Sequence, residues 1–240
     1  LKIYGILTIK SSLMTPIKKH ILFLVPDGVG IKNYLFSDII TNLKNDAKIT
    51  IWSTLPIEAF EDVKRNHNIE FDYKQIQLSP ENSLTRLYRE ASTYARLIYN
   101  SELQNNPTIL SNWRRSSYSL KVKLLYSFAE LLGRHLSKKY SRILNFEKKS
   151  INKIPQKSID KYFKDLEVIQ PSSIFITHQR VAGLMPICLA ANRLKIKTST
   201  AIYSWDNLPK ARLCVKVDYY LVWSSWMQQE MKDYYPEIEE

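Results

Sequence analysis

The stretch His20-Ile-Leu-Phe-Leu-Val25, followed at once by Pro26-Asp27-Gly28-Val29-Gly30, decides the fold class of this chain of 240 residues. A short, uninterrupted apolar run is typical of a strand that is buried on both faces, as the strands of a parallel sheet are. The proline and the two glycines predict that the strand ends in a tight loop. Apolar side chains at helical spacing follow over residues 34–43, and residues 48–52 are again strand-like. The chain therefore opens as strand, loop, helix and strand.

This alternation of strands and helices stops in a long helical middle segment and then returns. Further strands are predicted at residues 69–76, 172–177, 198–203 and 219–223, and helices at 56–65, 181–194 and 226–234. Such alternation favours a parallel sheet with helical crossovers. The sequence thus predicts an α/β, Rossmann-like parallel sheet with helices on both faces. Residues 83–166 form a helical, basic insertion in this prediction, broken near 105–107 and containing a polar linker at 148–157.

The ends and the apolar stretches define the expected domain organisation. Residues 1–13 precede Met14, and we expect them to be a non-native or disordered extension of one domain over residues 14–240. The longest apolar stretch, residues 181–191, is about half of the roughly 20 residues that a spanning helix needs. Cys188 and Cys214 lack the spacing of a disulfide framework or a zinc site, which favours a reducing cytoplasm.

The positive charge is concentrated in the middle of the chain. The net charge is +12, and residues 111–165 hold 14 Lys or Arg against 4 Asp or Glu. Such a segment can bind the phosphates of nucleic acid, anionic lipid head groups or a diphosphate-linked substrate. Leu120, Leu124, Phe128, Leu131, Leu132 and Leu136 follow helical spacing within it. Two interpretations remain open, because this stripe can face the core or lie on a membrane surface.

Polar side chains follow several of the predicted strands. In open parallel sheets, ligands bind beyond the carboxyl ends of the strands, so we expect these side chains to line one crevice. Histidine titrates near neutrality, which suits His178 to proton transfer, although a lone histidine can also be structural. The candidate residues are Asp27, Gly28, Gly30, His178, Gln179, Arg180, Ser204, Trp205, Asp206 and Asn207.

Each of these motifs has a structural alternative. The Asp27–Gly30 loop is equally a simple turn, and it is not the dinucleotide fingerprint because Asn33 takes the third glycine position. Asp206 or Asn207 can cap a helix instead of holding a sugar. The chain has no Asp-x-Asp pair, no His/Cys cluster with metal spacing and no Gly-x-Ser-x-Gly motif. Metal-dependent chemistry and a nucleophilic hydrolase are therefore disfavoured.

Residues 174–236 resemble bacterial surface-carbohydrate and capsule glycosyltransferases of the GT-B superfamily. The resemblance rests on Thr177-His178-Gln179-Arg180, Tyr203-Ser204-Trp205-Asp206-Asn207-Leu208, and Asp218 with Leu221-Val222-Trp223-Ser224, and residues 20–34 are similar to the first strand and turn of that superfamily. It implies half of a two-domain fold, in which a first domain binds mainly the acceptor and a second binds mainly the nucleotide-sugar donor. This chain then corresponds to the acceptor half and is inactive alone, with the nucleotide sugar as co-substrate and no further cofactor.

The resemblance also implies roles for the candidate residues. Asp27 or His178 takes the proton from the acceptor hydroxyl, with Asp27 slightly ahead because bases of related folds lie in that loop. The remaining candidates bind substrate, and Arg180 meets a phosphate. The acceptor is a sugar or a lipid-linked sugar, used in the cytoplasm in peripheral contact with an anionic membrane, and no nucleic acid is expected. The alternatives are a basic nucleic-acid-binding protein, consistent with a pI near 9.5, and a non-catalytic truncated remnant.

Overall fold

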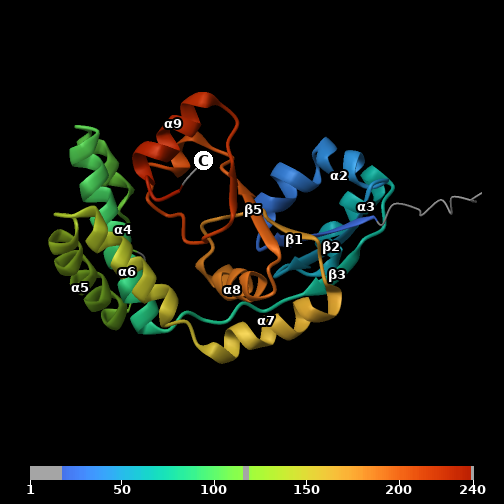
Figure 1. Ribbon diagram of the computed structural model, residues 1–240, viewed down its shortest axis with the longest axis horizontal. Coiled ribbons are helices and arrows are strands. Elements are labelled where there is room, and N and C mark those ends of the chain that lie inside the picture. Colours follow the sequence, from blue (N-terminus) through green and yellow to red (C-terminus); the bar gives the residue numbers. More distant parts are fainter. Residues whose placement is uncertain (1–17, 116–118, 239–240) are drawn as a thin grey trace, which may run out of the picture.

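The fold is built on one six-stranded sheet in which every strand pairs in parallel with its neighbours (Figure 1). The computed structural model describes residues 18–115 and 119–238. The strand order is β3-β2-β1-β4-β5-β6, which is the order of the doubly wound Rossmann sheet. This confirms the predicted α/β fold class. The strands are β1 (Lys19–Val25), β2 (Ala47–Ser53), β3 (Asp72–Gln75), β4 (Ser173–Ile176), β5 (Lys197–Ala201) and β6 (Tyr219–Leu221).

Strand β1 has an apolar core on each of its two faces. Leu22 and Leu24 point into one core, which is covered by α7 (Gln156–Ile169) and α8 (Met185–Arg193). Phe23 and Val25 point into the other, which is covered by η1 (Ile31–Leu35), α2 (Asp38–Leu43) and α3 (Glu61–His67). This explains why the sequence of β1 is a continuous apolar run, since both of its faces are buried.

The connection after β1 differs from the predicted loop. A short helix, α1 (Gly28–Gly30), begins directly after Asp27 and continues into η1, a π-helical turn. Ser37 then caps α2 through a hydrogen bond that its side chain accepts from Ile39 N. The predicted single helix over residues 34–43 is therefore two pieces, because Ser37 interrupts the helix with extended backbone. The next crossover contains η2 (Ile57–Phe60) before α3.

The crossover from β3 to β4 holds the predicted helical insertion. Its helices are α4 (Ser83–Leu103), η3 (Pro107–Asn112), α5 (Leu120–Leu136) and α6 (Tyr140–Asn152). Helices α4, α5 and α6 share a core of their own, formed by Ala91, Ala95, Ala129, Leu136 and Ile143. Figure 1 shows α4, α5 and α6 grouped on one side of the sheet domain.

The boundaries at the end of the insertion differ from the prediction. The polar linker predicted at 148–157 is wrong, since α6 continues to Asn152 and α7 already begins at Gln156, after Pro155. Proline is well tolerated at the start of a helix. Pro155 therefore marks the start of α7 and the end of the short connection from α6, rather than a long linker. Although the prediction assigned α7 to the insertion, its Ile159, Tyr162 and Leu166 lie in a core of the sheet domain.

Helix α5 presents most of its apolar stripe to solvent. Leu120, Leu124, Phe128 and Leu131 are 73%, 53%, 59% and 66% exposed. The interpretation as a core-facing stripe is therefore wrong for these four residues. The helix packs instead through Tyr126, Ala129, Gly133 and Leu136, so the core-facing interpretation holds for Leu136. A Cβ at Gly133 would lie 2.8 Å from Tyr94 Cδ1 and 3.0 Å from the Ala91 carbonyl oxygen, so α4 and α5 approach too closely for larger side chains.

A buried arginine fastens the insertion to the rest of the molecule. Arg96 of α4 is 1% exposed, and its Nη2 lies 2.7 Å from Glu147 Oε1 of α6 and 3.0 Å from Glu237 Oε1. Its Nη1 donates to the Tyr234 carbonyl at the end of α9 (Ser225–Tyr234), at 3.0 Å. One guanidinium thus joins two helices of the insertion to the segment that follows the last strand.

The described part of the chain, residues 18–115 and 119–238, contains no helix that is long and apolar enough to cross a bilayer.

Candidate functional site at the switch point of the sheet

Asp27 and His178 meet where the two halves of the sheet diverge. β1 and β4 are adjacent, yet the chain leaves β1 toward one face of the sheet and leaves β4 toward the other. This topological switch point is the usual ligand crevice of doubly wound folds. His178 Nδ1 lies 2.6 Å from Asp27 Oδ2, although the two residues are 151 positions apart. The sheet thus brings together both residues that were predicted to be catalytic.

The Asp27 carboxylate is held at both of its oxygens. Oδ1 accepts a hydrogen bond from Val29 N at 3.1 Å, which caps α1, while Oδ2 faces His178. The Asp27 side chain is 37% exposed, whereas that of His178 is 12% exposed. The local backbone therefore fixes the carboxylate in the orientation that holds the imidazole.

The two glycines of this turn differ in role. Neither has positive φ, so the conformational freedom that the sequence suggested is not used. A Cβ at Gly30 would lie 2.2 Å from Thr177 Oγ1, which shows that Gly30 is needed for packing α1 against the residue that follows β4. A Cβ at Gly28 would meet nothing within 4 Å. Gly28 therefore borders open space beside Asp27, where a ligand can approach the backbone.

Arg180 determines which imidazole nitrogen carries the proton. Its Nε–H donates to His178 Nε2 at 3.3 Å, and its Nη2 donates to the Tyr203 hydroxyl at 3.0 Å. Because a guanidinium can only donate, Nε2 must be the acceptor, and Nδ1–H donates to Asp27. This is the tautomer in which a carboxylate orients a histidine base.

Two tyrosines that were not among the predicted site residues complete this part of the crevice. Tyr203, which follows β5, makes an edge contact with His178 at a ring-centroid distance of 6.0 Å. Tyr34 Oη lies 3.4 Å from the Ala201 carbonyl oxygen, and burial raises the pKa of Tyr34 to about 12. Tyr34 therefore remains a neutral hydroxyl near neutral pH. The position of Tyr203 just beyond a strand end was a signal that could have identified it.

The loop after β5 contributes the third predicted group. Trp205, in η5 (Trp205–Asn207), is 68% exposed. Asp206 accepts a hydrogen bond from Ser204 Oγ at 2.7 Å and forms an ion pair with Lys210. The hydrogen bond from Lys210, then that from Ser204, and the charges of Lys210 and Arg180 lower the pKa of Asp206. Lys210 was not predicted. The N-cap residue of η5 is Ser204, whose side chain makes no capping hydrogen bond.

Gln179 and Asn207 lie apart from the open crevice. Their side chains are 0% and 1% exposed. Within the described residues, neither the amide nitrogen nor the amide oxygen of either side chain has a hydrogen-bond partner. A buried amide without hydrogen-bond partners destabilises the fold. A ligand or a rearrangement of the adjoining loop would restore hydrogen bonds to Gln179 and Asn207.

Fold and site together define the class as a Rossmann-like α/β protein with a carboxylate–imidazole pair at the switch point of its sheet. Within residues 18–115 and 119–238, no group of three or more His, Cys, Asp or Glu side chains is arranged to hold a metal ion. Comparison with known proteins found no matching family model, no matching curated protein and no matching solved structure.

Proposed function

We propose that this chain binds the hydroxyl-bearing acceptor of a metal-independent glycosyltransferase that acts in surface-polysaccharide biosynthesis. A second domain, outside this chain, would bind the nucleotide-sugar donor. The observation that carries the proposal is the 2.6 Å contact between His178 Nδ1 and Asp27 Oδ2 at the ligand crevice of a Rossmann-like sheet.

His178 is the proposed base, and Asp27 orients it. Both Asp27 oxygens are engaged, one by Val29 N and the other by His178, which favours His178 over the initially preferred Asp27. In the reaction, His178 Nε2 takes the proton of an acceptor hydroxyl as its oxygen attacks the anomeric carbon of the donor. The bond from that carbon to the nucleoside diphosphate breaks, and the diphosphate leaves with its electron pair. Asp27 stabilises the imidazolium that forms.

The loop after β5 supplies a surface for the acceptor. The exposed indole of Trp205 can stack on the apolar face of a sugar ring, and Asp206 and Ser204 lie next to it with hydrogen-bonding oxygens. Gly28 leaves room for the acceptor beside Asp27. These groups position a hydroxyl rather than activate a donor, which is why the proposal assigns the acceptor to this chain.

The test uses the full-length enzyme, screened against nucleotide sugars for transfer. We expect His178→Ala to lower turnover by about 10²- to 10⁴-fold, the range for removal of a general base. His135→Ala is the matched control, because His135 is an exposed histidine of α5 outside the crevice. Unchanged turnover in His178→Ala, with folding preserved by circular dichroism, would exclude His178 as the base.

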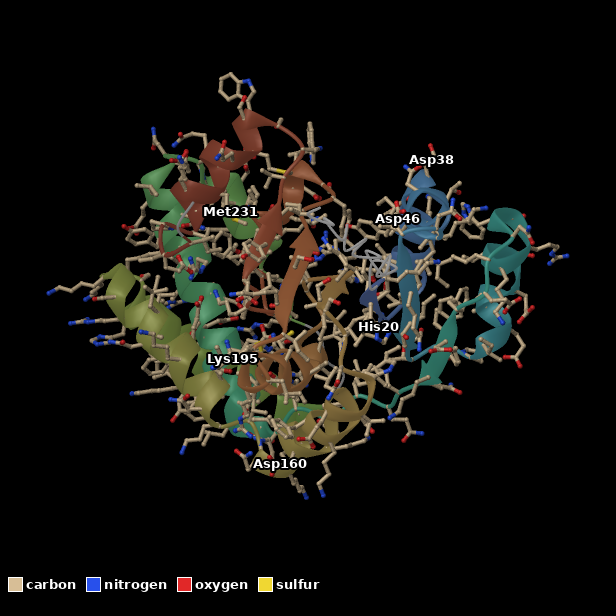
Figure 2. All side chains as sticks on the ribbon, turned by 45° about the vertical axis from the view of Figure 1, so that its right-hand side comes forward. His20, Asp38, Asp46, Asp160, Lys195 and Met231 are labelled. Carbon is tan, nitrogen blue, oxygen red and sulfur yellow. The ribbon has the colours of Figure 1, made fainter. Side chains whose placement is uncertain are left out.

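The exposed face of α5 supports a peripheral membrane contact at the cytoplasmic surface as part of the same proposal. Lys121, Lys123 and Arg134 are exposed on the helix that carries the apolar residues, and nitrogen-tipped side chains project outward from the insertion (Figure 2). Apolar side chains flanked by cations are typical of helices that lie in an anionic membrane surface. We expect the protein to float with phosphatidylglycerol vesicles, and we expect the double variant Leu124→Ser/Phe128→Ser to lose this association. Flotation that is absent, or equal in the variant, would contradict the contact.

A further inference from the structure

A concavity of about 470 Å³, here called the arginine pocket, lies next to the switch point and is lined by Arg180, which contacts His178. Its cationic side chains are Arg86, Arg89, Arg114, Arg180, Lys210 and Arg212. Glu90 is the single carboxylate among its described lining residues. Such a concentration of positive charge in one concavity attracts anions.

The pocket is formed jointly by the insertion and the sheet domain. Arg86 and Arg89 come from α4, and Arg114 follows η3. Arg180 follows β4, whereas Lys210 and Arg212 lie in the connection between β5 and β6. Neither part of the molecule holds the six cations alone. The position of the insertion therefore creates this pocket at the edge of the crevice.

Half of the pocket's cations are neutralised by the protein itself. Arg89 pairs with Glu81 at 2.7 Å and with Glu90 at 2.9 Å. Although burial opposes the charge of Arg89, these carboxylates raise its pKa. Arg212 lies 3.5 Å from Glu90, and Lys210 pairs with Asp206.

The other three cations make no such ion pair within the described residues, although the charge of Arg180 acts on Asp206 from a greater distance. Within the described part of the chain, Arg86, Arg114 and Arg180 form no salt bridge with a carboxylate. Arg86 Nε is in addition a buried donor without an acceptor, while Nη2 of the same side chain lies 3.4 Å from the Tyr126 hydroxyl. A buried guanidinium N–H without an acceptor is costly, so an oxyanion of a ligand would remove that penalty.

We propose that the arginine pocket binds a diphosphate group of a small ligand. Guanidinium groups suit phosphoryl oxygens because their planar N–H donors form paired, charge-assisted hydrogen bonds. Three arginines without a salt bridge match a diphosphate better than a single phosphate. The cations also converge on one concavity, whereas nucleic acid is bound along an extended basic track. This inference deepens the proposed function and rests on it for the identity of the ligand, but not for the binding itself.

Arg180 connects the arginine pocket to the proposed base. It lines the pocket, and its Nε–H occupies His178 Nε2 at 3.3 Å. A diphosphate that draws Arg180 into the pocket would release Nε2 to accept the proton of a hydroxyl. Arg180 is thus a positioning residue, and occupancy of the pocket makes the base available.

Two sources of a diphosphate are distinguished by the surroundings of the pocket. An apolar groove of about 650 Å³, lined by Leu84, Leu87, Leu124 and Phe128 among others, shares Arg86 with the arginine pocket. A prenyl diphosphate would use both concavities, whereas a nucleoside diphosphate would use the arginine pocket alone.

The test is isothermal titration of the 240-residue chain with inorganic pyrophosphate, which does not depend on turnover. We expect pyrophosphate to bind at least 10-fold more tightly than orthophosphate, and Arg86→Gln/Arg114→Gln to weaken pyrophosphate binding at least 10-fold. Arg65→Gln on α3 is the matched control, because the Arg65 side chain is 73% exposed and does not line the pocket. This control should bind as the wild type does.

Further arms separate this proposal from the proposed function. His178→Ala should bind pyrophosphate as the wild type does. This result is expected whether or not the variant loses turnover, so it tests the pocket independently of the proposed base. Geranyl diphosphate binding more tightly than uridine diphosphate would identify a lipid source, and the reverse order a nucleotide source; either order supports the diphosphate site. The proposal is overturned if pyrophosphate does not bind, if Arg65→Gln weakens binding equally, or if a short single-stranded RNA binds more tightly and depends on the same arginines.

Discussion

Helix α4 carries arginines in two opposite environments. Arg96 is 1% exposed and contacts two carboxylates, those of Glu147 and Glu237. Arg86, ten positions earlier on the same helix, lines a pocket and has no carboxylate partner within the described residues. A buried charge is retained for structure only when it is paired. The difference separates an arginine that holds the fold from one that is available to a ligand.

The largest effect that tests this comparison is expected at Arg96. Arg96→Met leaves Glu147 and Glu237 in a partly buried site with Lys216 as their shared cation, and breaking a buried ion pair costs up to about 3–5 kcal/mol. Arg86→Met on the same helix should change the free energy of unfolding by less than about 1 kcal/mol, since no ion pair is lost. Urea unfolding of both variants measures the difference.

A triple variant checks the cause of the Arg96 effect. Adding Glu147→Gln and Glu237→Gln to Arg96→Met removes the two carboxylates that have lost Arg96 and retain Lys216 as a shared cation, and should recover part of the lost stability. Equal losses in Arg96→Met and Arg86→Met would contradict the distinction between the two environments.

A smaller effect is expected from the pH dependence of the Arg96 cluster. Burial favours the neutral form of Glu237, but Arg96, Lys216 and the Tyr140 hydroxyl outweigh it and lower the Glu237 pKa. A carboxyl with a lowered pKa stabilises the fold above its unfolded pKa, about 4.3 for glutamate, and this contribution is lost as pH falls through the folded value. Between pH 6 and pH 3, the free energy of unfolding should thus fall more steeply in the wild type than in Glu237→Gln.

The arginine pocket supplies the control for this pH dependence. Arg86 has no carboxylate partner among the described residues. The free energy of unfolding of Arg86→Gln should therefore fall as steeply with falling pH as that of the wild type. Parallel curves for the wild type and Glu237→Gln would show that Glu237 contributes no such pH dependence.

The sequence allowed the crevice to be predicted because the features that form it are local. Apolar runs mark β1 and β4, and polar residues such as Asp27 and His178 directly follow them. Once a parallel sheet is assumed, its topology brings these positions to one edge. The contact between Asp27 and His178 needed only the further fact that β1 and β4 are neighbours, which is the usual order of this fold.

The arginine pocket and the Arg96 cluster could not be predicted in the same way. Arg96 and Glu237 are 141 positions apart, and no periodicity links them. The cations of the pocket come from α4, from the segment after η3 and from two loops of the sheet domain, so they meet only once the insertion is placed. For α5, the spacing predicted an amphipathic helix, but not that Tyr126, Ala129 and Gly133 would lie on the buried face in place of most of the leucines.

The smallest expected effect has the opposite sign to that at Arg96. Arg114 is exposed, lies among cations and has no carboxylate partner within the described part of the chain, so in the free protein it adds repulsion without a compensating pair. Arg114→Gln should therefore raise the free energy of unfolding slightly, by less than about 0.5 kcal/mol at low ionic strength. Salt screens exposed charges, so this gain should vanish in 1 M NaCl. In saturating pyrophosphate the wild type should become the more stable protein, because the ligand stabilises only a pocket that binds it. A loss of stability in Arg114→Gln without ligand would place Arg114 with Arg96, as an arginine that holds the fold.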